Sequence, residues 1–324
     1  MCSKTDTFPI PRMDDCIYKV GKAKYVKKFD LLKGFWLIPL TDRAKEISAF
    51  VTQDGLYQYK VMPFGMKNSP VSFQRVINKV VVDLEGCEAY IDDVIIHSAT
   101  WEENLRIIRE FFERLSRAML TINLSKSEFG QSQVTYLGHI VEEGEVKPLS
   151  AKVEAIANFP RPESKKQLMR FLGMAGYYRR FCPSFAAVAE MLTQLLSKMV
   201  KFLWSEQCDK AFEELKAMLQ SVPVRVLTAP DFKSPFKLAV DASDAADGTV
   251  LLQEDGEGVG HAMCYFSKKF NKSQNNYSTK EKECLALVSA LLHLEVYVTS
   301  SSLLIVVSSV HNALFFFFFS QDEG

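Results

Sequence analysis

The chain has 324 residues, which is too long for one typical domain, so we expect two or three. Its 39 basic and 39 acidic residues give a formal net charge of zero, which excludes a general attraction to polyanions and leaves only local basic clusters. The seven cysteines form no CxxC pair and no secretory signal opens the chain, which predicts an intracellular protein, cytoplasmic or nuclear and not secreted.

The N-terminal segment contains one predicted strand. Residues 1–20 are expected to form an extended lead-in, because Pro9, Pro11 and Asp14-Asp15 interrupt regular patterns. From Lys24 the polarity alternates as far as Phe29 and stops at Asp30. We therefore expect Asp30 at the end of a strand, at the edge of a sheet.

Two amphipathic helices are predicted next. The first begins at Pro70, with Ser69 as N-cap, and the second follows the capping-box pattern of Thr100 and Glu103. Their predicted buried faces are Phe73, Ile77, Val80, Val81 and Leu84 for the first helix, and Leu105, Ile108, Phe112 and Leu115 for the second.

Between these helices, Asp92 and Asp93 follow Tyr90-Ile91 and lie between two apolar β-type segments, which predicts a tight hairpin. Adjacent carboxylates repel and raise one pKa unless a cation offsets them, so the pattern favours a divalent metal; a solvated turn is the alternative. Mg²⁺ typically uses one or two carboxylates together with substrate phosphates. Asp30 would complete a two-metal phosphoryl-transfer site with Asp92 and Asp93.

The middle of the chain predicts a hairpin and then helices. Val134 and Tyr136 precede a turn at Glu143-Gly144, and a helical region is expected to begin at Pro148. Ser164 and Gln167 cap a helix that buries a stripe of apolar residues, and Pro183 separates it from another helix ending near Leu196. That stripe is Leu168, Phe171, Leu172 and Ala175.

A basic cluster lies within residues 161–180, where six basic residues face a single acid, Glu163, and are interleaved with aromatic residues. Phosphate contact is favoured over the alternative of a solvated helix face. The six are Arg161, Lys165, Lys166, Arg170, Arg179 and Arg180.

The last third predicts a helix, two hairpin strands, a second helix and a strand. Residues 205–220 have helical spacing, 236–240 alternate toward Asp241, a turn lies near Asp255-Gly256, and Ser278 with Glu281 caps a helix to about Leu294. A strand is expected at 303–307. The apolar segment 302–319 raises a membrane anchor as an alternative, but its polar centre favours a buried strand followed by an irregular tail and no membrane partner.

Four segments resemble, in the same order, the motifs of reverse transcriptases from gypsy-type LTR retrotransposons. They are residues 29–35, residues 61–70 with Phe73-Gln74, residues 90–93 and residues 136–139. Residues 171–181 are similar to the thumb of that family, 211–216 to its connection, and 240–244 with 251–253 to the opening of its RNase H domain. The resemblance implies an α+β fold: a reverse-transcriptase palm with partial fingers at 1–147, a helical thumb at 148–200, a connection at 201–230 and an incomplete RNase H-like domain at 231–324.

The resemblance also implies an RNA-directed DNA polymerase that adds dNTPs to a DNA primer on an RNA template. Asp30, Asp92 and Asp93 would hold two Mg²⁺ ions, with Mn²⁺ as an alternative. The implied nucleotide-binding residues are Leu31, Phe35, Phe64, Gly65, Gln74 and Lys126. Phe35 would exclude a 2′-hydroxyl, and its alternative is an ordinary core aromatic. Lys126 would protonate pyrophosphate, and its alternative is a surface lysine. The alternative for Gln74 is a solvated helix residue.

Two departures from the family pattern weaken these implications. Asp241 and Glu283 match two of the four acids of an RNase H centre, but Val310 stands where the third is expected, and the chain ends before a fourth. The chain also begins almost at the palm, so weaker nucleotide binding is expected. An active ribonuclease H acting on RNA/DNA hybrids and a non-catalytic nucleic-acid-binding remnant are therefore the alternative functions.

Overall fold

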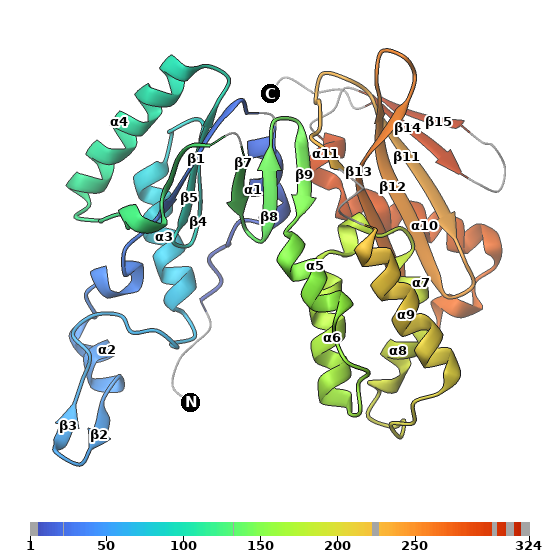
Figure 1. The fold of residues 1–324 in the computed structure, drawn as a ribbon, viewed down its shortest axis with the longest axis horizontal. Coiled ribbons are helices and arrows are strands. Elements are labelled where there is room, and N and C mark those ends of the chain that lie inside the picture. The colour runs from blue at the N-terminus through green and yellow to red at the C-terminus, as the bar shows by residue number, and fades with distance from the viewer. Residues whose placement is uncertain are drawn as a thin grey trace. The chain divides into compact units, whose positions relative to one another are not determined.

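The computed structural model describes residues 6–21, 23–131, 133–221 and 227–299, and the backbone of 303–308 and 314–318. The chain forms two compact units, which Figure 1 shows as ribbons. The first comprises Met1–Leu137 and Val141–Gly144, and the second comprises Gly138–Ile140 and Glu145–Gly324. The finer division into four parts stays a prediction.

The first unit is built on an antiparallel four-stranded sheet with the order β4-β5-β1-β6. Two of its registers matter for the site: Asp30 of β1 lies opposite Asp93 of β5, and Tyr90 of β4 also lies opposite Asp93. The predicted strand and the predicted hairpin are thus confirmed. The strands are β1 (Tyr25–Asp30), β4 (Cys87–Tyr90), β5 (Asp93–Ser98) and β6 (Glu128–Gln131).

Helices α3 (Ser69–Val81) and α4 (Trp101–Arg117) cover one face of this sheet and share a core with Phe29, which is fully buried. The ring of Phe29 lies 5.5 Å from that of Phe111. Because side chains alternate along a strand, burial of Phe29 among the helices directs Asp30 toward the opposite face.

Three predictions about helices in this unit are wrong in detail. Residues 13–21 form helix α1 (Met13–Gly21) instead of an extended segment, because Ile17 and Val20 bury fully and Asp14-Asp15 favour a helix N-terminus. The N-cap of α3 is Asn68, not Ser69, and Leu84 is buried beyond the end of that helix.

Helix α4 begins as predicted, with the Thr100 hydroxyl accepting a hydrogen bond from the Glu103 N–H. Leu115 is buried as predicted, but the other buried positions lie one residue earlier than predicted, at Asn104, Ile107 and Phe111. Leu105 and Phe112 are exposed, since apolar residues occupy both candidate faces and only packing against the sheet decides between them.

The rest of this unit consists of short elements. Helix α2 and the two-stranded sheet β2-β3 extend from the four-stranded sheet. Neither was predicted from the sequence, and all residues of β2 and β3 are exposed. These elements are η1 (Gly34–Leu37), α2 (Asp42–Ile47), β2 (Phe50–Thr52), β3 (Gly55–Tyr57) and η2 (Leu124–Lys126).

The chain passes from the first unit to the second along β7 (Gln133–Tyr136), β8 (His139–Glu142) and β9 (Glu145–Pro148). The predicted turn at Glu143-Gly144 is confirmed, and Gly144 adopts a φ of 77° that glycine tolerates best. Within the second unit, β9 pairs with β10 (Leu227–Thr228). Helical structure begins at Ser150, slightly later than Pro148.

The helices of the second unit pack through aromatic side chains, with the rings of Phe171 and Phe212 4.5 Å apart. The predicted cap at Ser164 is present, where the Ser164 side chain accepts from the Gln167 N–H. Ser205, for which no cap was predicted, also caps a helix by accepting from the Cys208 N–H. The helices are α5 (Ser150–Ala157), α6 (Lys165–Tyr177), η3 (Arg179–Phe181), α7 (Phe185–Val188), α8 (Glu190–Leu195) and α9 (Glu206–Gln220).

A five-stranded sheet with the order β13-β12-β11-β14-β15 completes the second unit, and α10 packs against β11 and β12 (Figure 1). Strands β11 and β14 are parallel and the other pairs are antiparallel. The strands are β11 (Phe236–Ala242), β12 (Ala246–Glu254), β13 (Gly260–Lys269), β14 (Leu303–Ser308) and β15 (Leu314–Phe318).

The remaining elements are η5 (Gln274–Asn276), α10 (Thr279–His293) and α11 (Glu295–Thr299). Ser278 and Glu281 form the predicted capping box of α10. The prediction of an irregular tail after β14 is wrong, because the backbone of Leu314–Phe318 pairs with β14. No helix within the described residues is long and apolar enough to cross a membrane.

Candidate active site

The segments that carry the three acids predicted to bind metal lie side by side where β1 ends and the β4-β5 hairpin turns. Asp30 and Asp93 lie opposite each other in the sheet, and Asp92 occupies the turn. The Leu31 N–H donates to the Asp92 carbonyl over 2.9 Å, and the Asn123 N–H donates to the Asp30 carbonyl over 2.7 Å. The Leu31–Asp92 bond and the pairing of β1 with β5 therefore hold the two Asp-bearing segments side by side, while the Asn123 bond ties Asp30 to the segment before η2.

The charges at this point crowd one another. Desolvation raises the pKa of Asp92, and the neighbouring carboxylates of Asp93 and Asp30 raise it further, while Lys126 acts in the opposite direction. Asp93 also pairs with Lys28, whose Nζ lies 3.3 Å from a carboxylate oxygen. Lys28 is a neighbour that sequence reasoning missed, although it lies two positions before Asp30 on the same strand face.

The described residues contain no group of three or more His, Cys, Asp or Glu side chains close enough together to hold a metal ion. The fit to a metal therefore rests on the donor set, which consists of hard carboxylate oxygens of the kind that Mg²⁺ prefers. It also rests on the crowding that raises the pKa of Asp92, because a bound cation would relieve it.

An aromatic cluster is centred on Phe35, five residues after Asp30 in the chain. The ring of Phe35 lies 5.1 Å from that of Phe64 and 5.6 Å from that of Phe73. Phe64 is 61% exposed, and Gly65 has a φ of 88° with open space where a Cβ would lie. Phe35 thus bridges the core and an exposed surface, which leaves both of its predicted roles open.

Two other predicted nucleotide contacts lie in different surroundings from those expected. The Leu31 side chain is buried in the core, so only its backbone, which holds Asp92, lies at the site. Gln74 is fully buried and its amide hydrogen-bonds the β4-β5 hairpin, so the alternative of a solvated helix residue is wrong. Lys126 is exposed in η2 and influences Asp92 electrostatically.

The predicted phosphate-binding cluster is divided by the fold. Arg180 is only 7% exposed, and this burial argues against a phosphate contact. Arg179 donates a hydrogen bond to the Ser267 carbonyl. Lys165 donates to the carbonyls of Ser197 and Val200, 2.5 and 2.6 Å away. Lys166 and Arg170 are exposed on α6 and stay predicted contacts.

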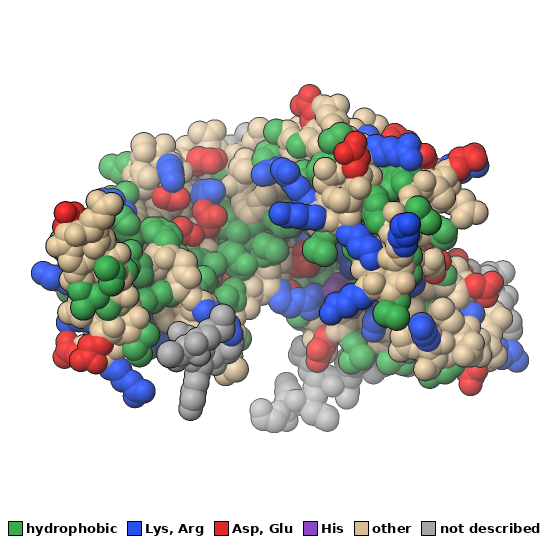
Figure 2. Space-filling model, turned by 90° about the horizontal axis from the view of Figure 1, so that it is seen from below, with side chains coloured by type: hydrophobic (Ala, Val, Ile, Leu, Met, Phe, Trp, Pro, Cys, Tyr) green, Lys and Arg blue, Asp and Glu red, His purple; other side chains and the backbone are tan. Residues whose placement is uncertain are grey.

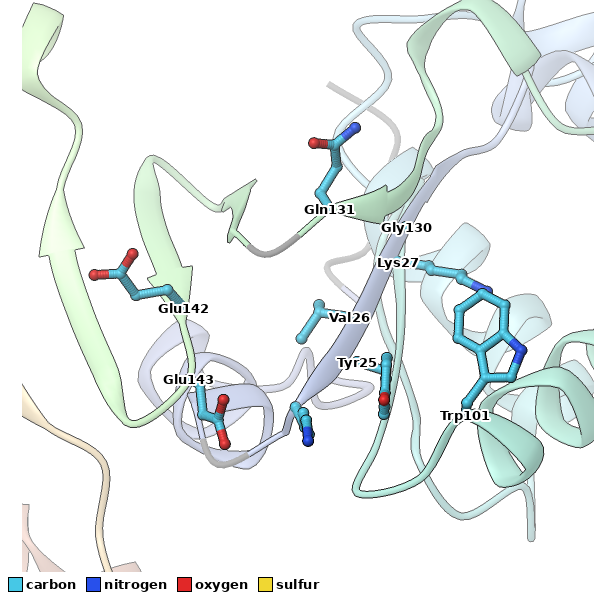
Figure 3. A pocket seen from close by; sticks show the side chains of 9 residues that line it. Tyr25, Val26, Lys27, Trp101, Gly130, Gln131, Glu142 and Glu143 are labelled. Atoms are coloured by element: carbon cyan, nitrogen blue, oxygen red, sulfur yellow. The ribbon is translucent and has the colours of Figure 1, made fainter.

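A cavity of about 580 Å³ in the first unit lies at the other end of β1 from Asp30 (Figure 3). Lys27 reaches over the Trp101 ring there, with Nζ 4.3 Å from the centroid, and Glu142 and Glu143 line the opposite wall. Five residues of strand separate Tyr25 from Asp30, roughly 16 Å, so this cavity does not contain the predicted acids.

In the second unit, Asp241 lies near the end of β11 and is exposed, whereas Glu283 lies on α10 with its Oε1 atom buried and lacking a hydrogen-bond partner. Asp247, which follows Asp241 on the next strand, is fully buried, and burial raises its pKa to about 6. The position of Val310 lies outside the described residues.

Known proteins share the two domains of this chain. Residues 1–141 match the family "Reverse transcriptase (RNA-dependent DNA polymerase)", and residues 204–305 match "RNase H-like domain found in reverse transcriptase". The Pol polyprotein from transposon 297 of Drosophila melanogaster is 40% identical over 88% of this chain and 26% of its own length. The polyprotein of transposon Tf2-3 of Schizosaccharomyces pombe is 32% identical over 92% of this chain and 22% of its own length.

Among solved structures, a foamy viral protease-reverse transcriptase in complex with double-stranded DNA superposes with a TM-score of 0.81. It is 22% identical, and the match covers 95% of this chain and 54% of that one. The same enzyme with an RNA/DNA hybrid gives a TM-score of 0.79 at 23% identity over 95% of this chain and 41% of that one. These likenesses confirm the α+β reverse-transcriptase fold.

The chain thus spans about a quarter of the length of the curated relatives in which its two domains occur. Sequence motifs, fold and family matches agree on which region that is. Residues 1–141 belong to the reverse transcriptase family and residues 204–305 to its RNase H-like domain, the region that this chain shares with retrotransposon Pol polyproteins.

Proposed function

We propose that this chain is an RNA-directed DNA polymerase that joins dNTPs to the 3′-hydroxyl of a DNA primer on an RNA template. The observation that carries the proposal is that the segments bearing Asp30, Asp92 and Asp93 lie side by side at one end of the sheet, joined by the pairing of β1 with β5 and by the hydrogen bond from the Leu31 N–H to the Asp92 carbonyl.

Asp30, Asp92 and Asp93 would hold two Mg²⁺ ions, which when bound lower the barrier by neutralising the triphosphate and activating the 3′-hydroxyl. The carboxylates supply part of each coordination shell, and substrate phosphates would supply more, because Mg²⁺ seldom occupies an all-protein cage. Lys28 neutralises part of the charge on Asp93 in the absence of substrate.

The aromatic cluster centred on Phe35 would receive the nucleotide. Phe35 is braced by Phe73 from the core and by Phe64 from the surface, so its ring has little freedom to move away from a ribose. The open space at Gly65 would let a nucleotide approach the backbone closely. Lys126, near Asp92, would supply positive charge beside the leaving pyrophosphate.

The nucleic-acid partner would contact the exposed surface of α5 and α6. A hollow of about 610 Å³ there is lined by Lys152, Arg170, Gly173 and Tyr177, among others. Gly173 has open space where a side chain would be, which permits close approach of a polymer backbone. Figure 2 shows Lys and Arg side chains among apolar ones on the face where these helices lie. The solved neighbours hold double-stranded DNA and an RNA/DNA hybrid, which supports this choice of partner.

We further propose that hydrolysis of RNA in a hybrid is weak. Asp241 and Glu283 are present, but valine at position 310 has no oxygen with which to hold a metal ion. An active ribonuclease H is therefore a less favoured function than polymerisation.

Primer extension tests the proposal directly. With oligo(dT) on poly(rA), Mg²⁺ and dTTP, the unaltered chain should extend the primer. Asp92→Asn should reduce the rate by about 10²–10³-fold, because charge stabilisation by the metal is worth several kcal/mol. Asp54→Asn, at an exposed turn between β2 and β3, is the matched control and should retain the rate. Template binding without synthesis by the unaltered chain would instead support the non-catalytic remnant.

A further inference from the structure

The amide of Gln74 joins α3 to the hairpin that carries Asp92. Gln74 is fully buried; its Oε1 accepts from the Ile91 N–H over 2.7 Å, and its Nε2 donates to the Ala89 carbonyl over 2.9 Å. Strand β4 is the edge of its sheet, so these outward-facing backbone groups have no strand beside them. One side-chain amide therefore takes the place of a neighbouring strand at the end of β4.

The residue held in this way has an unusual backbone conformation. Ile91 has a φ of 55°, a left-handed value that a β-branched residue rarely adopts. Such a conformation persists only where the surrounding structure holds it. Asp92 follows directly, so the backbone at Ile91 sets the direction in which the Asp92 carboxylate leaves the turn.

Asn78 completes the arrangement one helical turn further along α3. Its Oδ1 accepts from the Gln74 Nε2 over 2.7 Å, so both hydrogens of that nitrogen are used. A reversed Gln74 amide would place its oxygen against the Ala89 carbonyl and its nitrogen against the Ile91 N–H, so these two backbone groups select the orientation. Asn78 holds the amide in that orientation by accepting its second hydrogen.

We propose that Gln74 and Asn78 form a positioning pair that holds the Ile91 backbone and thereby aims the Asp92 carboxylate at the metal ions. The pair deepens the proposed polymerase function and rests on it. It also replaces the role predicted from the sequence, because a fully buried Gln74 touches the hairpin instead of a nucleotide.

The test uses substitutions that alter the pair at increasing distance from the acids. Gln74→Met removes both hairpin bonds at similar volume, and Asn78→Leu leaves Gln74 in place but removes the acceptor that holds its amide nitrogen. Asn78→Asp retains an acceptor for Gln74 Nε2 and is the conservative variant. Lys79→Gln, on the exposed side of the same helix, is the matched control.

We expect kcat for primer extension to fall about 10- to 100-fold in Asn78→Leu and at least as far in Gln74→Met, as for other groups that orient metal ligands. The KM for dTTP and the Kd for template-primer should stay close to those of the unaltered chain. Asn78→Asp should recover most of the rate, and Lys79→Gln should retain it.

Amide hydrogen exchange at Ile91 provides a readout that does not depend on activity. Exchange should accelerate in Asn78→Leu and Gln74→Met, and should stay slow in Asn78→Asp and Lys79→Gln. Unchanged exchange and unchanged kcat in Asn78→Leu would overturn the positioning pair, even if the polymerase assignment held. Failure of the unaltered chain to extend a primer would remove the proposed function, while the exchange measurement would still decide whether the pair holds the turn.

Discussion

The acid sites of the two units differ in how their residues are brought together. In the first unit, Asp30 and Asp93 lie opposite each other on adjacent strands and Asp92 directly precedes Asp93 in the turn, so strand register and the turn place the three backbones side by side. In the second unit, Asp241 lies on β11 and Glu283 on α10, so their separation depends on how a helix packs against a sheet. The first site thus has its backbone positions fixed within one sheet, whereas the second depends on the packing of two different elements.

The largest expected difference between the units is in their contribution to synthesis. Asp30→Asn should reduce primer extension by about 10²–10³-fold, because it removes a metal ligand. Asp241→Asn should leave extension unchanged. Parallel primer-extension assays of the two variants test this difference. If Asp241→Asn were equally inactive, the acids of the two units would not differ in their contribution to synthesis.

Cleavage of an RNA/DNA hybrid tests the acid site of the second unit. The unaltered chain should cleave the RNA of a labelled RNA/DNA hybrid slowly, and Val310→Asp should raise the rate about tenfold or more by adding a carboxylate ligand. Glu283→Gln in the Val310→Asp background is the control and should abolish the gain. Rapid cleavage by the unaltered chain would show that valine at this position is tolerated.

A buried acid gives the second unit a pH dependence of stability. Burial raises the pKa of Asp247 from 3.8 to about 6, so the unfolded chain releases this proton at a lower pH than the folded chain. Stability should therefore fall as the pH rises from about 4 to about 6, by about 3 kcal/mol in total.

Urea unfolding of the unaltered chain and of Asp247→Asn, measured across this pH range, tests that expectation. The fall should be present in the unaltered chain and much smaller in the variant, because asparagine does not titrate. Equal pH profiles for the two proteins would show that another group is responsible.

The smallest expected effect concerns glycines, one in each unit. A Cβ at Gly34 would lie 2.7 Å from Phe73 Cζ, so Gly34→Ala should destabilise the chain by about 1–3 kcal/mol through overpacking. Gly173, in the middle of α6, has open space, and Gly173→Ala should stabilise by about 0.5–1 kcal/mol. Thermal unfolding should give a lower Tm for Gly34→Ala and a higher Tm for Gly173→Ala than for the unaltered chain. Tm shifts of the same sign in both variants would contradict the packing argument.

The sequence by itself determined the features that depend on neighbouring residues. The strand ending at Asp30, the hairpin at Asp92-Asp93 and the caps at Thr100, Ser164 and Ser278 all follow from local pattern and short-range hydrogen bonds. The ordered motifs likewise identified the family, because each is a contiguous set of residues.

Only the tertiary structure decided which of several local options was used. It selected the buried face of α4, gave residues 13–21 a surface against which to form a helix, and placed Arg180 in the core. Most of all, it turned Gln74 toward the hairpin, where its amide bonds Ala89 and Ile91. These outcomes depend on burial against residues distant in the chain, and a local sequence pattern carries no record of such contacts.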